Sequence, residues 1–225
     1  MMIISKSDFL QVDIIPKPSV ALVGRNRELI QIQEAFNDSN INVLSIIAGS
    51  GIGKSALIWQ WLQQIQPNYK GIIFGWSFHG QSSHQAINSL SQFLKKVLPF
   101  FGFQGKQTDD DFEKVIILGK YLRKKQSILV LDSLESLQYP AHILGGECMI
   151  IKELLDCLQY LNGKENLVLI SSQQPLVELE SWSNHQRLDL QTLTTTDGVK
   201  LLKNIGCNND LEMLQKTSYD RVVMH

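Results

Sequence analysis

The chain has 225 residues, 44% of them hydrophobic and 19% charged, which is enough for one ordinary domain with a sizeable core but too short for two full ones. Its 21 Lys and Arg residues against 22 Asp and Glu residues give a net charge of −1, which predicts no nucleic-acid partner and no anionic membrane partner. The 3 cysteines have neither zinc-site spacing nor an even number, which predicts a reducing, cytoplasmic setting, and no apolar run approaches the roughly 18 residues of a spanning helix.

Apolar patterning predicts an alternation of helices and strands along the chain. Residues 1–19 end in Pro16-Lys17-Pro18, which disfavours a helix and predicts an extended lead-in. The predicted strands are apolar throughout, as in a parallel sheet covered on both faces, so we expect a three-layer α/β fold with a mostly parallel central sheet. The predicted helices cover 27–36, 54–66, 85–98, 110–124, 149–162 and 195–204, and the predicted strands cover 42–47, 71–78, 127–132, 167–171 and 187–190.

A glycine-rich turn follows the predicted strand 42–47 and leads directly into a helix. It reads Ala48-Gly49-Ser50-Gly51-Ile52-Gly53-Lys54-Ser55 and fits the GxxxxGK[ST] phosphate loop, with alanine in place of the first glycine. Glycines let the backbone N–H groups approach phosphate, and the helix N-terminus adds partial positive charge. Lys54 is predicted to reach the β- and γ-phosphates, and the Ser55 hydroxyl to bind magnesium. The predicted nucleotide contacts are Gly49, Ser50, Gly51, Ile52, Gly53, Lys54, Ser55 and Ala56.

An acid at the end of a neighbouring strand should accompany such a loop, because magnesium bound to phosphates needs a carboxylate nearby. Asp132 closes the predicted strand 127–132 and is the predicted partner of Ser55 in the magnesium site, as a Walker B aspartate. Taken alone, an acid at the end of a strand more often caps a turn or a helix than it contacts a metal. Glu135 lies three residues further on and could polarise the attacking water, with an exposed loop glutamate as the alternative. Asp132 and Glu135 are the catalytic candidates.

Several further segments resemble the STAND class of signal-transducing P-loop ATPases, the relatives of NB-ARC and NACHT proteins. The resemblance spans about 20 to 205, and its segments are Val23-Gly24-Arg25, Gly75-Trp76-Ser77-Phe78, the stretch from Leu129 to Gln138, and Leu193-Thr194 before the last predicted helix. It implies an ASCE-type P-loop NTPase that binds ATP and ADP with Mg²⁺ as a nucleotide-dependent switch. It also implies that Val23 and Arg25 lie near the adenine, and that the intact parent protein forms homo-oligomers.

The chain also departs from this family, and two alternative functions stay open. Members of this family commonly have an arginine at the end of the second-to-last strand, whereas this chain reads Ser171-Ser172-Gln173 there. The missing arginine favours a non-hydrolysing nucleotide-binding or interaction module. An AAA+ ATPase uses the same two motifs and is the other alternative. By the resemblance, helical modules follow the ATPase domain, so the expected division is an extension at 1–19, the domain at 20–205 and the start of a truncated helical module at 206–225. Trp76 is expected to pack in the core, and the alternative is that Trp76 and His79 line the cleft.

Overall fold

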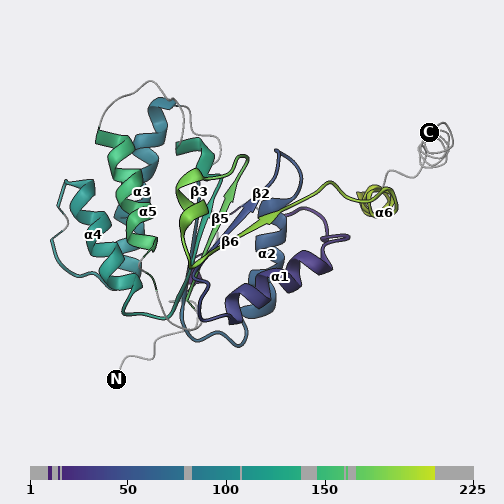
Figure 1. Ribbon diagram of the computed structural model, residues 1–225, viewed down its shortest axis with the longest axis horizontal. Helices are drawn as coiled ribbons and strands as arrows, with labels where there is room; N and C mark the ends of the chain where they lie inside the picture. Colours follow the sequence, from purple (N-terminus) through teal and green to yellow (C-terminus); the bar gives the residue numbers. More distant parts are fainter. Residues whose placement is uncertain are drawn as a thin grey trace.

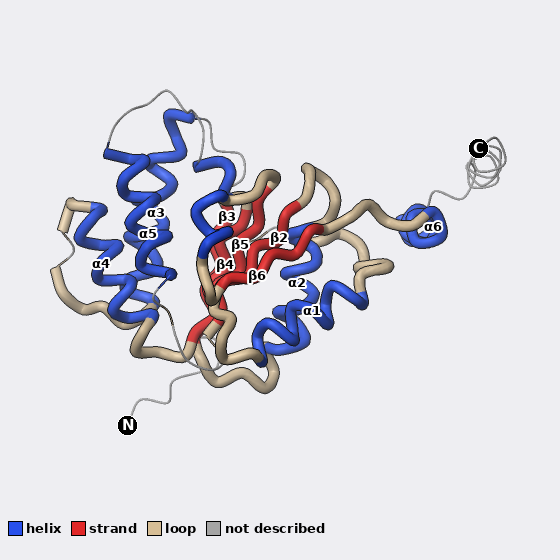
Figure 2. Tube along the Cα trace, viewed as in Figure 1, coloured by secondary structure: helices blue, strands red, loops and turns tan. Residues whose placement is uncertain are grey.

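The structure is a computed structural model that describes residues 10–11, 15, 17–78, 83–106, 108–137, 146–159, 161 and 166–205. These residues form a six-stranded sheet with a layer of helices on each face (Figures 1 and 2). The strands are β1 (Leu10–Gln11), β2 (Val43–Ile47), β3 (Ile72–Ser77), β4 (Ser127–Asp132), β5 (Leu167–Ser172) and β6 (His185–Asp189). The α-helices are α1 (Asn26–Asn37), α2 (Lys54–Ile65), α3 (Ser83–Phe100), α4 (Asp111–Leu122), α5 (Gly146–Gln159) and α6 (Thr195–Ile205).

All five strand pairings of the sheet are parallel, in the order β1-β3-β4-β5-β2-β6. Parallel strands end at a common edge, so the residues that follow β2, β4 and β5 come together although they are far apart in sequence. Strand β5 lies between β2 and β4, which separates the strand before the glycine-rich turn from the strand that ends in Asp132. This is the predicted three-layer α/β fold with a parallel central sheet.

Burial on both faces explains why the strands are apolar throughout. In β4, Leu129 and Leu131 point into the core that α3, α4 and α5 cover, whereas Ile128 and Val130 point into the core under α1 and α2. Figure 1 shows these two helical layers on opposite sides of the sheet. A strand whose alternate residues enter two separate cores has no polar face, which is the pattern that identified it in the sequence.

The structure corrects several predicted boundaries. Helix α3 begins at Ser83 and continues to Phe100, one residue past Pro99, where the prediction had ended it early. Helix α5 covers Gly146–Gln159, three residues earlier than predicted, and β6 starts at His185. The short strand β1 pairs with β3, and Ile15 is buried in the core under α1 and α2. Two short 3-10 helices, η2 (Leu134–Leu137) and η3 (Val177–Ser181), were not predicted.

Parts of the predicted organisation lie outside the described residues. They include the module at 206–225 and the side chain of His79. The division into an extension, a domain and a further module therefore stays a prediction.

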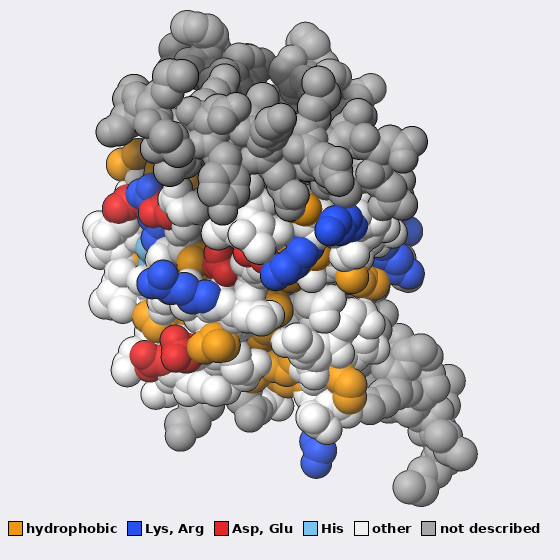
Figure 3. All heavy atoms as spheres, turned by 90° about the vertical axis from the view of Figure 1, so that its right-hand side faces the viewer, with side chains coloured by type: hydrophobic (Ala, Val, Ile, Leu, Met, Phe, Trp, Pro, Cys, Tyr) orange, Lys and Arg blue, Asp and Glu red, His pale blue; other side chains and the backbone are white. Residues whose placement is uncertain are grey.

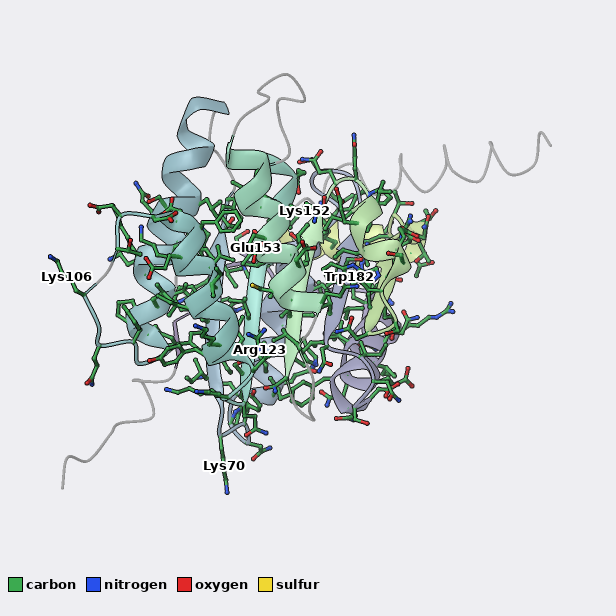
Figure 4. All side chains as sticks on the ribbon, turned by 60° about the vertical axis from the view of Figure 1, so that its left-hand side comes forward. Lys70, Lys106, Arg123, Lys152, Glu153 and Trp182 are labelled. Carbon is green, nitrogen blue, oxygen red and sulfur yellow. The ribbon has the colours of Figure 1, made fainter. Side chains whose placement is uncertain are left out.

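The surface of the described part carries charges of both signs. Lys, Arg, Asp and Glu side chains are interspersed on the face shown in Figure 3. Lys70 and Lys106 point outward from the body of the domain in Figure 4. Arg123 is the C-cap residue of α4, where a cation complements the partial negative charge of the helix terminus. None of the described helices combines the length and the apolar character needed to cross a membrane.

Candidate functional site

The glycine-rich turn joins β2 to α2 at the carboxyl edge of the sheet. Gly51 has φ +76° and Gly53 has φ +102°, a region that other residues rarely adopt, so glycine is required at these two positions. Ala48 has no positive φ and its side chain is buried against the core under α1 and α2, which explains why alanine replaces the first glycine of the motif without changing the turn. The turn ends at Gly53, and α2 begins with Lys54.

Lys54 is folded back onto the turn that precedes it. Its side chain is 8% exposed, and Nζ donates to the carbonyl oxygens of Ala48 at 2.6 Å and Gly49 at 3.1 Å. Burial lowers the pKa of Lys54, while the charges of Glu135 and Asp132 act in the opposite direction. The ammonium group is therefore held at the centre of the turn, with two carboxylates close enough to influence it.

Asp132 ends β4 and is 1% exposed. Its carboxylate accepts hydrogen bonds from three serine hydroxyls: Ser55 Oγ to Oδ1 at 2.9 Å, Ser171 Oγ to Oδ1 at 2.6 Å, and Ser77 Oγ to Oδ2 at 2.9 Å. The predicted pair of Ser55 and Asp132 is thus in direct contact. Ser77 and Ser171 were not predicted as site residues, although each stands near the carboxyl end of a strand that neighbours β4, which is the one signal the sequence offered.

Glu135 lies just beyond Asp132, on η2. The chain turns at Ser133, the one described residue other than glycine with a positive φ, at 58°. Glu135 Oε2 is buried and has no hydrogen-bond partner among the described residues. A buried carboxylate oxygen without a donor is costly unless a ligand or water satisfies it, so this atom is available to a bound group.

A cavity of about 220 Å³ connects these parts. It brings together most of the predicted site residues from α2 and the turn with Asp132 and Glu135 from the far side of β5. It also includes Gln173, from the segment where the sequence departs from the family pattern. The lining residues are Ser50, Gly51, Gly53, Lys54, Ser55, Ala56, Asp132, Ser133, Glu135 and Gln173. Gly49 and Ile52 belong to the same turn but do not line this cavity.

Arg25 contacts the turn from the side of α1. It is 4% exposed, and its guanidinium donates to Ile52 O at 3.2 Å and to Gln191 O at 2.7 Å. It also pairs with Glu28 at 3.1 Å. Arg25 is not among the residues that line the cavity, and Val23 is half-buried in the segment before α1. The guanidinium thus joins the glycine-rich turn to the chain that leaves β6.

That chain leads into α6, which begins against the same segment. Thr194 Oγ1 accepts from Asp197 N at 3.1 Å, and its hydroxyl donates to Asp197 Oδ2 at 2.8 Å. The hydrogen bond from Thr194 lowers the pKa of Asp197. A Cβ on Gly24, which has φ +69°, would lie 2.6 Å from the Asp197 carboxyl, so only glycine fits there. No residue of α6 is buried, and the helix projects away from the sheet in Figure 1.

Trp76 lies in the core, as the sequence led us to expect, and it does not line the cavity. Trp76 packs in the core against Phe78 and Phe93, with ring centroids 6.5 and 6.0 Å away. Within the described part of the chain, no cluster of three His, Cys, Asp or Glu residues could hold a metal ion by itself.

The comparisons with known proteins show the fold. No family model and no curated protein matches the sequence. ORC1 of Aeropyrum pernix, solved in complex with DNA, superimposes with a TM-score of 0.53 at 17% identity over 88% of this chain and 52% of that one. A signal transduction ATPase with numerous domains (STAND) from Pyrococcus horikoshii, which has a tetratricopeptide repeat sensor, superimposes with a TM-score of 0.53. The identity is 17%, over 92% of this chain and 29% of that one. Drosophila ORC bound to DNA superimposes with a TM-score of 0.57 at 15% identity, over 96% of this chain and 54% of that one.

These likenesses show that the chain has the fold of P-loop ATPases, and they fit both the AAA+ type and the STAND type. The chain spans about half the length of the two ORC chains and less than a third of the STAND chain. The prediction of no nucleic-acid partner is corrected, because two of these three neighbours were solved with DNA. That prediction relied on net charge, which averages over the whole chain and cannot exclude a local contact surface.

Proposed function

We propose that this domain binds ATP and ADP with Mg²⁺ in the cavity between the glycine-rich turn and Asp132, and acts as a nucleotide-dependent switch. The observation that carries the proposal is the convergence of Lys54, Ser55 and Asp132 on one cavity at the carboxyl edge of a parallel sheet. The P-loop ATPase fold of the chain supports the same ligand.

Each of these side chains has a chemical role toward a nucleotide. Lys54 would exchange the carbonyls of Ala48 and Gly49 for phosphate oxygens, which are stronger acceptors for an ammonium group. Ser55 and Asp132 offer a hydroxyl and a carboxylate, the oxygen ligands that Mg²⁺ prefers. Magnesium in such a site neutralises charge on the phosphates during transfer.

Hydrolysis would depend on Glu135. Its unpartnered Oε2 supports a role as the base that orients water, since the turn at Ser133 directs η2 toward the cavity. A non-hydrolysing module is the second candidate, and a specific observation favours it. Lys54 is the one cation among the described residues that line the cavity, and Gln173 offers a neutral amide. Charge developing on the γ-phosphate would then have little cationic support.

The switch role rests on Arg25. Its guanidinium contacts both Ile52 in the turn and Gln191 before α6, so a nucleotide that shifts the turn would change the support of α6. The packing of Gly24 against Asp197 joins the segment before α1, to which Arg25 belongs, to α6 itself. Val23 and Arg25 lie in the segment that the family resemblance assigns to the adenine.

Thermal unfolding with and without Mg-ATP and Mg-ADP tests nucleotide binding. Ligand at about 100 times its dissociation constant adds roughly 2.7 kcal/mol, or on the order of 5–10 °C for a domain of this size. The shift should disappear in Lys54→Ala and persist in Lys70→Ala, an exposed lysine outside the cavity. A cooperative transition that ligand leaves unchanged in the wild type would refute nucleotide binding.

Hydrogen exchange tests the switch. Protection of the amides in residues 191–205 should change when Mg-ATP binds, and should stay unchanged in Arg25→Ala at saturating nucleotide. Equal hydrogen exchange of this segment in the free and nucleotide-bound wild type would mean that nucleotide binding is not coupled to α6.

A further inference from the structure

Asp132 on β4 stands in a row of polar side chains that crosses three strands, between Ser77 on β3 and Ser171 on β5. Ser77 is the register partner of Asp132 in the pairing of β3 with β4, and Leu131 pairs with Ile170, which places Ser171 beside Asp132 on β5. Side chains that are opposite each other in neighbouring strands lie on the same face of the sheet. Phe78 N also donates to Asp132 O at 2.9 Å, which fixes β3 against the end of β4. The row is therefore set by strand register.

The hydrogen-bond directions in this row are determined by chemistry. Ser133 N donates to Ser171 Oγ at 2.9 Å, so the hydroxyl accepts there and uses its own proton for Asp132 Oδ1. Ser77 donates to the other oxygen, Oδ2. Ser171 is fully buried and Asp132 nearly so, which leaves the carboxylate little freedom to rotate. Both oxygens are thus fixed from the side of the sheet.

Ser55 differs from the other two serines because it belongs to the nucleotide-binding turn and helix. A hydroxyl that binds Mg²⁺ directs a lone pair to the metal, so the present contact of Ser55 with Asp132 would rearrange when the metal enters. Ser77 and Ser171 lie on strands and would keep their contacts. The carboxylate would then meet the metal in an orientation that these two residues already impose.

We propose that Ser77 and Ser171 are positioning residues that orient Asp132 and so set the affinity of the nucleotide site for Mg²⁺. This inference rests on the proposed function, since it concerns the same site. It assigns a role in metal binding to the end of β3, a segment outside both sequence motifs. Loss of a hydrogen-bonded partner of a metal-binding side chain typically lowers metal affinity about 10- to 100-fold.

The test compares ATP binding in EDTA with ATP binding in MgCl₂, by calorimetry, for the wild type, Ser77→Ala, Ser77→Thr and Asp132→Asn. The ratio of the two dissociation constants isolates the contribution of the metal. Ser77→Ala should leave binding in EDTA unchanged and reduce the ratio about tenfold, toward that of Asp132→Asn. Ser77→Thr retains a hydroxyl and suits a strand, so it should restore the wild-type ratio.

The outcomes separate this inference from the function on which it rests. A wild type that binds no ATP in either buffer overturns both. If ATP binding by the wild type depends on Mg²⁺ but Ser77→Ala has the same ratio of dissociation constants in EDTA and MgCl₂, only the positioning role is overturned. Equal weakening of Ser77→Ala in EDTA and MgCl₂ likewise overturns it, because it would reveal a general effect on folding. Ser171→Ala, which also removes the acceptor of Ser133 N, should reduce the ratio as well and melt at a lower temperature.

Discussion

Replacing Arg25 by alanine should both destabilise the domain and weaken ATP binding. The side chain is 4% exposed and donates to two backbone carbonyls, those of Ile52 and Gln191. A hydrogen bond to a charged group contributes about 1.5–3 kcal/mol, and such contributions are not additive, so we expect a loss of about 3 kcal/mol from the pair. The part-buried ion pair with Glu28 is lost as well, which adds to this cost because Glu28 keeps its charge without a partner.

Urea denaturation measures the loss of stability. With a slope of about 2 kcal/mol per molar, a loss of about 3 kcal/mol lowers the midpoint by roughly 1.5 M. ATP affinity should fall about tenfold, since the carbonyl of Ile52 loses the donor that fixes the turn. Arg27→Ala is the matched control, because Arg27 is an exposed arginine on the same helix.

Equal urea midpoints and equal ATP affinities in Arg25→Ala and Arg27→Ala would refute both expected effects. A large loss of ATP affinity with an unchanged midpoint would also count against the expected loss of stability. That result would assign Arg25 to direct contact with the nucleotide, as the family resemblance implies, and would remove its role in joining the turn to α6.

Three further predictions concern the base, a half-buried histidine and a helix contact. Glu135→Gln should lower the rate of ATP hydrolysis by about 10²- to 10⁴-fold with little change in ATP affinity, measured by phosphate release and calorimetry; equal turnover would exclude Glu135 as the base. Burial lowers the pKa of His185, whose Nε2 lies 2.8 Å from Ser45 Oγ. Its contribution to the free energy of unfolding is therefore complete above its unfolded pKa of about 6.5 and is lost as the pH falls below that value. In His185→Gln this decrease in the free energy of unfolding should be smaller. A Cβ on Gly119 would lie 3.1 Å from Cys157 Sγ. Gly119→Ala should therefore lower the free energy of unfolding by about 1 kcal/mol after its gain in helix propensity, and by less in a Cys157→Ala background. Additive losses in this double-mutant cycle would contradict the contact.

Local sequence patterns were sufficient for most of the fold. Continuous apolar runs identified β2, β3, β4 and β5, because both faces of the sheet are buried and no alternation remains. The two residues of β1 are too few to show any period, and β6 mixes exposed and buried positions at the sheet edge. Helix α3 passes Pro99 because its last turn packs through Phe100 and Phe101 in the core, a tertiary contact that sequence patterning does not show.

The candidate site likewise has one part that local sequence patterns identify and one part that they do not. The glycine-rich turn is a continuous segment whose glycines, Lys54 and Ser55 are recognisable by spacing alone, and Asp132 follows from its place at a strand end. Ser77 and Ser171 become recognisable only when the register of three strands is known. Serine is common at strand ends and in turns, so its presence there carries little information by itself.

Arg25 illustrates why function requires more than the motif. Its contact with Gln191 joins positions 166 residues apart, and no local pattern encodes such a pair. The turn by itself provides chemistry for binding phosphate, and that chemistry would be the same in a static binding protein. A switch additionally requires that some element outside the site depends on the conformation of the turn. In the switch that we propose, this dependence runs through the buried guanidinium of Arg25, so nucleotide binding and its transmission to α6 should be separable by substitution. Lys54→Ala should abolish the first, and Arg25→Ala should abolish the second at saturating ATP.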